Sequence, residues 1–377
     1  MTPADKPTKR RVTLFRWWPL LLLAVVLLLR ALLPASVLET VYSRGIFVGV
    51  RSVWDYTLPL LPVPLFYLFW AGLIAWIAYS IRQWGRGRRW SLSLPNGYGD
   101  GLKKRWVRFG RRLLNSVALL VAVFLIGWGF NYGRAEVNDV IGFTPYQPTL
   151  DELRSRVQED AAELALLRNR VTTDTTALTA AILPEDLENA IRPLVVRALE
   201  RHAYPAPGRP RLRRLWPKGI LLRFSTAGVY WPWAGEGNID AGLHPLQQPA
   251  VAAHELAHAY GFGDEGTCTF WAWLAGRETD DPALRYAFKL AYWRRIAGKL
   301  RQQEPEDYTA WRAAHLDAGI RNDLQAIYDN ASLYQDIAPV IRDVTYDTYL
   351  KAQGIHEGLL NYGKVVRLVE GYRRRKE

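Results

Sequence analysis

The sequence predicts an α-helical transmembrane region followed by a mainly helical, α+β domain with a small sheet. Three observations predict this organisation. Three apolar runs, each close to the roughly 20 residues that cross a bilayer, lie within residues 1–133. Basic residues flank these runs, whereas residues 134–377 are nearly neutral overall. Helical patterns dominate the second region, and strand-like segments occur only between residues 211 and 240.

The formal net charge of +13 belongs to the first region. Residues 1–133 hold 18 Lys and Arg against 4 Asp and Glu, whereas residues 134–377 hold 31 against 32. Basic residues beside apolar runs are typical of the loops that set membrane topology. We therefore expect a lipid bilayer as a partner, and no nucleic acid. The single cysteine excludes an intramolecular disulfide.

The apolar runs predict three transmembrane helices, at residues 17–37, 59–81 and 113–132. The second and third runs contain no charge over most of their length, which favours spanning over burial in a core. The first run is interrupted by Arg30, and its basic start also fits a cleaved signal peptide. Trp17, Trp18 and the length of the run favour an uncleaved anchor.

The loop charges predict the orientation of these helices. Residues 1–16 carry a net charge of +4, and residues 82–112 hold ten Lys and Arg against one Asp, whereas the loop 38–58 is balanced. By the positive-inside rule, the N-terminus and the loop 82–112 are cytoplasmic. Three crossings then place the chain after about Arg134 outside the cytoplasm.

The second region begins with helical signals. Thr149 followed three residues later by Glu152 is a capping box, which predicts a helix to about Asn169. A second helix is predicted from about Pro184 to Arg201, with the proline in its first turn. After the strand-like segments, helices resume at about Gln247 and continue almost to the end of the chain.

A metal-binding motif lies on the first of these later helices, in the segment His254-Glu255-Leu256-Ala257-His258. Residues four apart on a helix lie on one face, so both imidazoles can reach one ion. Glu255 is rotated by about 100° from His254, where a base can take a proton from water on the metal. Two surface histidines are the alternative. The flanking residues favour the metal site, because they are apolar all round and buried His and Glu need partners.

A catalytic zinc commonly has three protein ligands, and three acidic residues compete for the third position. Glu265 follows a Gly-Phe-Gly turn and begins the next helix, which can fold back on the first. Asp264 fits equally well as the N-cap of that helix. Glu278 has a spacing like that of thermolysin, but it lies in what looks like an exposed acidic helix exit. We expect Glu265 to be the ligand.

Three stretches of this second region carry a resemblance: Ser225–Asp240, His254–Phe270 and Tyr346–Val366. They resemble a family of bacterial membrane proteins of unassigned function, with a few N-terminal spans and a zincin-like C-terminal domain. The three stretches lie within residues 140–370, the part of the chain that the resemblance covers. The family usually has a more acidic run, of the type Glu-Asp-Glu-Ala-Asn-Phe, where this chain has Glu265 to Phe270. Only the first acid is retained, which again favours Glu265.

The resemblance implies further site residues. Zincins pair an extended substrate with an edge strand, and Gly228, Val229 and Tyr230 are the candidates, although an aromatic core strand fits them equally well. Transition-state partners could come from Tyr230, Tyr346, Tyr362 or His356, each of which also fits a core or surface role. Glu236 is interpreted as a turn residue, and Cys268 as a small core residue.

The leading hypothesis is a membrane-anchored, zinc-dependent, gluzincin-like metallopeptidase, with Glu255 activating water. Its substrate is a peptide or protein, and it is expected to be a multi-pass protein of the bacterial plasma (inner) membrane with an extracytoplasmic C-terminal domain. The alternative is a non-catalytic membrane scaffold or sensor that keeps a structural or vestigial zinc. A closed four-ligand site favours that alternative, and an open position opposes it.

Overall fold

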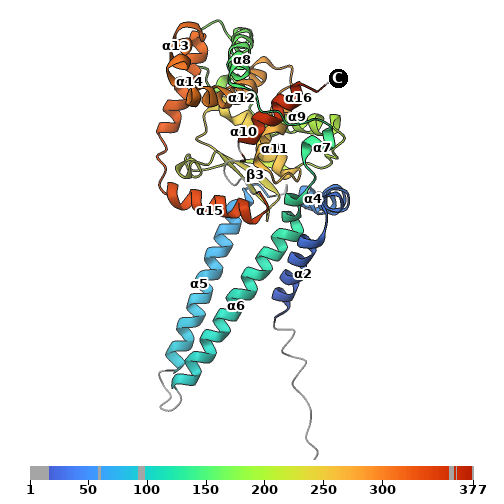
Figure 1. Ribbon diagram of the computed structural model, residues 1–377. Helices are drawn as coiled ribbons and strands as arrows, with labels where there is room; N and C mark the ends of the chain where they lie inside the picture. Colours follow the sequence, from blue (N-terminus) through green and yellow to red (C-terminus); the bar gives the residue numbers. More distant parts are fainter. Residues whose placement is uncertain (1–16, 58–60, 92–97, 356–360, 362, 376–377) are drawn as a thin grey trace, which may run out of the picture. The chain divides into compact units, whose positions relative to one another are not determined.

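The computed structural model describes residues 17–57, 61–91, 98–355, 361 and 363–375. The chain is mainly helical with one three-stranded sheet, as predicted (Figure 1). It divides into two compact units. The first consists of Met1–Pro34 and Leu65–Phe130, and the second of Ala35–Pro64 and Asn131–Glu377. Residues 35–64 thus belong with the C-terminal unit, whereas the sequence assigned them to the membrane region.

The first unit contains helices α2 (Trp18–Leu32), α5 (Leu65–Ser91) and α6 (Tyr98–Gly127), and α2 packs against α6. Among the described residues, Leu65–Arg82 and Trp106–Gly127 are long and apolar enough to cross a membrane. A third span exists only if α2 and the helical segment Ala35–Thr57 after it form one bent span. With 15 residues, α2 alone measures about 22 Å, short of a hydrocarbon core of about 30 Å. Two or three helices can therefore cross a bilayer.

The second unit contains the sheet, in the region where the sequence predicts strands. Its strands are β1 (Arg211–Leu215), β2 (Gly228–Trp231) and β3 (Glu236–Asp240). The order is β1-β3-β2, with β3 parallel to β1 and antiparallel to β2, so β2 forms one edge. Glu236 is not the turn residue that the sequence suggested, because it is the first residue of β3 and is buried.

Helices surround this sheet and form the core of the second unit (Figure 1). Helix α10 packs against β2, β3, α9 and α11. The helical segments of the second unit and of its junction with the first are α3 (Ala35–Val37), η2 (Leu38–Ile46), α4 (Phe47–Thr57), η4 (Gly129–Gly133), α7 (Val137–Ile141), α8 (Leu150–Val171), η5 (Ala180–Ile182), α9 (Leu187–Arg201), η6 (Leu222–Phe224), η7 (Pro245–Gln247), α10 (Gln248–Ala259), α11 (Glu265–Ala275), α12 (Pro282–Gln303), α13 (Pro305–His315), α14 (Ala318–Ser332), α15 (Pro339–Ala352) and α16 (Lys364–Arg373).

Two helix starts test the predicted boundaries. The capping box of α8 is present: Thr149 Oγ1 accepts a hydrogen bond of 3.3 Å from the Glu152 N–H, and Glu152 Oε2 accepts one of 2.8 Å from the Thr149 N–H. Helix α9 begins at Leu187 rather than near Pro184, because Asp186 caps it by accepting a hydrogen bond from the Asn189 N–H. The helix therefore starts after its acidic N-cap, Asp186, and not at Pro184.

A buried ion pair joins α8 to α14. The carboxylate of Asp323, with no exposed surface, accepts hydrogen bonds of 2.8 Å from Arg168 Nε, 2.6 Å from the Tyr286 hydroxyl and 2.8 Å from the Leu178 N–H. Three donors from separate segments converge on one carboxylate. Removing the Asp323 carboxylate leaves the guanidinium of Arg168 buried without a counter-ion.

We therefore expect Asp323→Ala to lower the free energy of unfolding by about 3–5 kcal/mol. Denaturant unfolding of the full chain in detergent, followed by tryptophan fluorescence, measures the change. Asp329→Ala is the matched control, because Asp329 is an exposed residue of the same helix. Equal effects of the two substitutions would contradict the prediction.

Candidate metal centre

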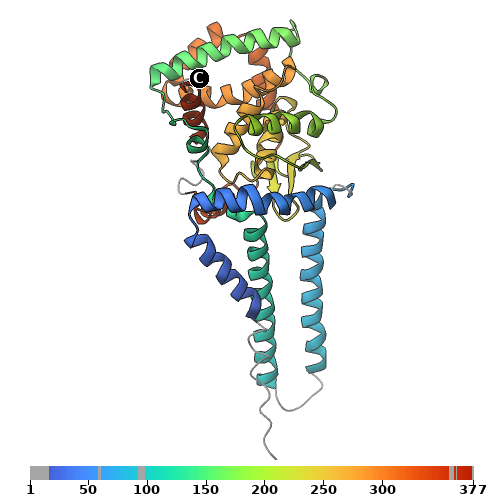
Figure 2. The ribbon, with the colours of Figure 1, turned by 90° about the vertical axis from the view of Figure 1, so that its right-hand side faces the viewer.

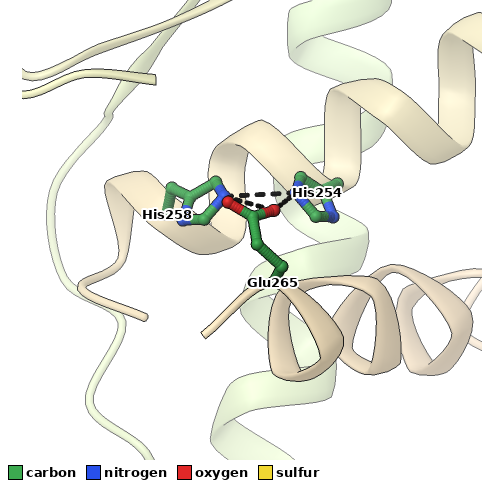
Figure 3. Close-up of side chains that lie close together, drawn as sticks. All are labelled: His254, His258 and Glu265. Carbon is green, nitrogen blue, oxygen red and sulfur yellow. Dashed lines mark hydrogen bonds and ion pairs between the residues drawn. The ribbon is translucent and has the colours of Figure 1, made fainter. Parts of the chain in front are cut away.

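Helix α10 carries the two histidines of the predicted metal site. Pro249 lies in its first turn, and Gly261 lies just past its end in the left-handed region, at φ +88°. Four of its apolar residues are buried and lie on different sides of the helix: Ala252, Ala253, Leu256 and Ala257. His254 and His258, one turn apart, project to the same side (Figure 3). The predicted helix is therefore present, and it is buried.

Helix α11 brings the acidic group. Asp264 caps this helix by accepting a hydrogen bond of 2.6 Å from the Thr267 N–H, and Glu265 is its first residue. The left-handed conformation of Gly261, which a side chain would strain, lets the chain reverse between the two helices. The Glu265 carboxylate consequently points toward both imidazoles (Figure 3).

Three donor atoms meet at this point. His254 Nε2 lies 3.1 Å from His258 Nε2 and 3.0 Å from Glu265 Oε2, and His258 Nε2 lies 3.5 Å from the same oxygen. A tetrahedral site with bonds of about 2.0–2.1 Å separates its ligand atoms by about 3.3 Å. The three separations therefore match the edges of such a site.

The hydrogen bond on the far side of His258 decides its tautomer. His258 Nδ1 lies 2.7 Å from the carbonyl oxygen of Phe262, which can only accept, so Nδ1 donates. In the neutral ring, Nε2 is then an acceptor. The buried thiol of Cys268 also donates to the Phe262 oxygen, at 3.3 Å, and contacts the imidazole rather than the cluster of donor atoms.

The tautomer of His254 follows from a similar chain of hydrogen bonds. Its Nδ1 lies 3.1 Å from Thr269 Oγ1. The Thr269 hydroxyl donates its own proton to the Glu265 carbonyl oxygen, at 2.9 Å. The hydroxyl therefore accepts from Nδ1, and Nε2 of His254 also carries a lone pair.

Two imidazole nitrogens and a carboxylate thus converge, an arrangement that can hold a cation. The pKa values reflect the mutual attraction of the carboxylate and the imidazoles. Burial alone would lower the pKa of His258, but Cys268 and Glu265 outweigh it and raise that pKa well above its usual range. Burial would raise the pKa of Glu265, but the two imidazoles hold it well below its usual range. Among the described residues, these three form the cluster able to hold a metal ion.

Glu255 lies beside this cluster on the same helix and is buried. Burial raises the pKa of its carboxyl to about 8, against smaller opposing effects of His258 and the Tyr230 backbone. A β-carbon on Gly228 would lie 2.6 Å from Glu255 Oε1, and one on Gly237 would lie 3.1 Å from the Glu255 β-carbon. Glycines in β2 and β3 therefore make room for this carboxyl.

The edge strand β2 contains the three predicted substrate-binding residues. Gly228 contacts Glu255, as described above, and Val229 is the next residue of the strand. The ring of Tyr230 stacks on that of His258, with centroids 6.4 Å apart. The structure therefore brings Gly228 next to Glu255 and Tyr230 next to the candidate ligand His258.

Tyr346, a predicted transition-state residue, contacts a candidate ligand. From α15, its hydroxyl donates a hydrogen bond of 2.6 Å to Glu265 Oε1, the oxygen that does not face His254. This bond fixes the orientation of the carboxylate. Thr269 and the Phe262 carbonyl do the same for the imidazoles. No pattern in the sequence marks these two partners beyond their place near the motif.

The remaining predicted residues lie away from the cluster or outside the described part. Glu278 pairs with Arg201 at 2.9 Å. Asp264 caps α11 and accepts a hydrogen bond of 2.7 Å from Asn361 Nδ2. His356 and Tyr362 lie outside the described residues. Of the three acids considered, Glu265 therefore has the geometry of a ligand.

We expect Tyr346→Phe to weaken metal binding about 10–100-fold, because residues that orient a ligand contribute on that scale. Competition of the purified chain with a chelator of known affinity, using Zn²⁺ as the probe, measures the change. Tyr349→Phe is the control, because the Tyr349 hydroxyl contacts Tyr132 at 3.0 Å. If the two variants bind equally well, the Tyr346 hydroxyl does not orient Glu265.

A family model described as "Protein of unknown function (DUF3810)" matches residues 42–369. That range includes the candidate metal centre and most of the helical segment η2–α4. No curated protein and no solved structure matches the chain.

Proposed function

The chain belongs to the DUF3810 family, and we propose that it is a membrane-anchored, zinc-dependent hydrolase of peptide bonds. The observation that carries this proposal is the convergence of His254 Nε2, His258 Nε2 and Glu265 Oε2, all within 4.8 Å of one another. The orientation of each ring by its Nδ1 contact supports a metal in preference to a chance cluster.

Zinc fits this donor set. Two imidazoles and one carboxylate are the ligands of gluzincin-type peptidases, and three protein ligands leave one position for water or substrate. When bound, zinc polarises a carbonyl oxygen and lowers the pKa of water. We accordingly infer a zincin-like domain, in which α10 carries the motif and α11 the third ligand.

Glu255 is the proposed general base. Its carboxylate accepts a proton from the attacking water and then delivers it to the leaving amine of the substrate. The glycines at 228 and 237 leave room for this carboxyl beside the cluster. Its burial keeps most bulk water away from the carboxyl.

Strand β2 is the proposed binding site for an extended substrate. An edge strand can pair with a peptide through its backbone groups. Gly228 places the backbone against Glu255, so a peptide paired with Val229 and Tyr230 passes close to the base. The substrate class is therefore an extended peptide segment.

The charge pattern supports an extracytoplasmic site. The basic residues of the loop 82–112 favour the cytoplasmic side, and α6 then leads to a second unit on the outer face of a bacterial plasma membrane. The proposed substrates are consequently peptides or proteins on that face.

A direct test uses the full chain purified in detergent. We expect about one zinc per chain and cleavage of peptides from an unstructured library, because the three donor atoms make a single site. A chelator should abolish cleavage, and added Zn²⁺ should restore it. Stoichiometric zinc without cleavage of any peptide would favour the scaffold or sensor alternative.

A further inference from the structure

The helical segment 38–57, formed by η2 and α4, has an inverted distribution of polarity. Its charged side chains are Glu39, Arg44, Arg51 and Asp55. Three of them are buried against the rest of the second unit, and Arg44 is about one quarter exposed. A helix on the surface of a soluble domain normally does the opposite and turns its charges outward. Figure 2 shows the segment as a continuous blue rod along one side of this unit.

One set of inward contacts centres on Glu39. Its two carboxylate oxygens accept hydrogen bonds of 2.8 Å from Nη2 and Nε of Arg134, in a bidentate pair. Arg44 donates to the same carboxylate at 2.8 Å and to the carbonyl oxygen of Ala203 at 2.6 Å. Bidentate pairs of this kind are the stronger ion pairs in proteins. The segment is therefore fixed to the second unit in one rotational setting.

A second set of contacts centres on Arg51. Its guanidinium pairs with Asp55 at 3.5 Å, donates to the carbonyl oxygen of Pro207, and lies 4.6 Å from the ring centroid of Tyr260. Asp55 in turn accepts a hydrogen bond of 2.8 Å from the Arg209 N–H. This set repeats the inward orientation of charge farther along the segment.

The outward face of the segment carries no charge. Its exposed residues are Thr40, Val41, Gly45, Ile46, Gly49, Val53, Tyr56 and Thr57. Val53 and Tyr56 expose 62% and 79% of their surfaces. An apolar face with an aromatic residue near its end is typical of a helix that lies in a membrane interface.

The chain keeps the ends of this segment near a bilayer. The segment follows the apolar helix α2, which ends at Leu32, and precedes α5, whose part Leu65–Arg82 is long and apolar enough to span. Eight chain steps separate Thr57 from Leu65, so at most about 30 Å of chain joins the end of the segment to the start of α5. Both ends are thus tethered to apolar helices.

We propose that the uncharged face of residues 38–57 lies in the headgroup region of the bilayer and holds the second unit against the membrane surface. The partner of this face is the lipid surface itself. The buried charges Glu39, Arg51 and Asp55 form the polar side of this interfacial helix. In other helices of this kind the polar side faces water, whereas here it faces the protein domain.

This arrangement bears on the substrate, a step that rests on the proposed hydrolase function. Phe47 packs against Gly261, three residues beyond His258, and Trp54 packs against Gly235 in the turn between β2 and β3. The segment 38–57 therefore contacts the turn that follows α10 and the turn that follows β2. The substrates are membrane-held proteins, cleaved in an extended segment close to the bilayer surface.

Spin labels test the lipid contact independently of any activity. The full chain is reconstituted in zwitterionic liposomes as Val53→Cys or Tyr56→Cys, with Leu166→Cys and Tyr328→Cys as exposed controls away from the segment. The native Cys268 is buried, so the unsubstituted chain defines background labelling. We expect labels at 53 and 56 to collide severalfold more often with oxygen than with a water-soluble nickel complex, and the control labels to show the reverse.

Two results would overturn the lipid contact. Labels at 53 and 56 that are as accessible to nickel as the controls would place this face in water. Labels protected from both reagents would place it against another protein chain. Neither result depends on zinc or on hydrolysis.

A tethered peptide tests the inference that the substrates are held at the membrane. A peptide that the detergent-purified chain cleaves is attached to liposomes by a short linker, and its cleavage is compared with that of the free peptide. We expect on the order of tenfold faster cleavage of the tethered form, because both partners share one surface. The spans of α5 and α6 keep the chain in the bilayer, so Val53→Glu should reduce this advantage rather than abolish it, without changing cleavage of the free peptide, whereas Leu166→Glu should leave both unchanged. An advantage that is the same in Val53→Glu and in the unsubstituted chain would overturn the proposed positioning, while the absence of cleavage of any peptide would overturn the hydrolase and leave the labelling result standing.

Discussion

Glu265→Ala is expected to remove zinc from the purified chain. The substitution deletes one of three donor atoms and leaves two imidazole lone pairs 3.1 Å apart without the carboxylate that faces them. Loss of a ligand should exceed the roughly 10–100-fold effect of changing a residue that only orients one. Metal analysis after dialysis and competition with a chelator measure the stoichiometry and the affinity.

Glu278→Ala is the matched control for this experiment. Glu278 is the acid that the sequence left open as an alternative ligand, but its carboxylate pairs with Arg201, away from the histidines. We expect this variant to keep zinc at the wild-type level. Zinc retained by Glu265→Ala and lost by Glu278→Ala would reverse the ligand assignment. Far-ultraviolet circular dichroism of both variants separates loss of a ligand from loss of the fold.

The parts of the fold that the sequence predicted correctly are set by local interactions. The capping box at Thr149 and Glu152 marks the start of α8 by itself. The apolar residues around His254 and His258 imply a buried helix, because both faces of it are apolar. The glycine at 261 marks the turn that brings Glu265 back. Each of these signals lies within about one helical turn of the feature that it predicts.

The segment 38–57 could not be predicted in this way. Its balanced charges suggested an ordinary loop between two spans. In the structure those charges are partners of residues far along the chain, with Glu39 bound to Arg134 and Asp55 to the backbone of Arg209. Long-range ion pairs leave no periodic pattern in one sequence. The burial of charge, and the exposure of apolar residues opposite, became visible only with the fold.

The candidate metal site also has parts that the sequence could predict and parts that it could not. The spacing of the histidines on one helix predicts that they share a face, and the turn after α10 favours Glu265 over Glu278. The contact of Tyr346 with Glu265 joins residues 81 positions apart, so no local pattern could indicate it. The sequence included Tyr346 among several tyrosines but could not place its hydroxyl on the ligand carboxylate.

Glu255→Gln is expected to leave zinc bound while removing hydrolysis. The amide has nearly the shape of the carboxyl, so it fits between the glycines at 228 and 237, where a β-carbon on Gly228 would already lie 2.6 Å from Oε1. An amide does not accept the proton of the attacking water. General acid–base catalysis contributes about 10²–10⁴-fold, or roughly 3–5 kcal/mol of the activation barrier, so kcat should fall by that factor.

Glu255→Gln is informative because zinc content and kcat are both measured on the same variant. In the proposed mechanism His254, His258 and Glu265 hold the metal and Glu255 is the base, so zinc content and kcat should separate in Glu255→Gln and fall together in Glu265→Ala. Glu278→Gln, which makes the same chemical change at the residue paired with Arg201, should alter neither. A Glu255→Gln chain that keeps both zinc and wild-type kcat would exclude Glu255 as the base. Such a result would require another residue to take the proton, even with the three donor atoms in place.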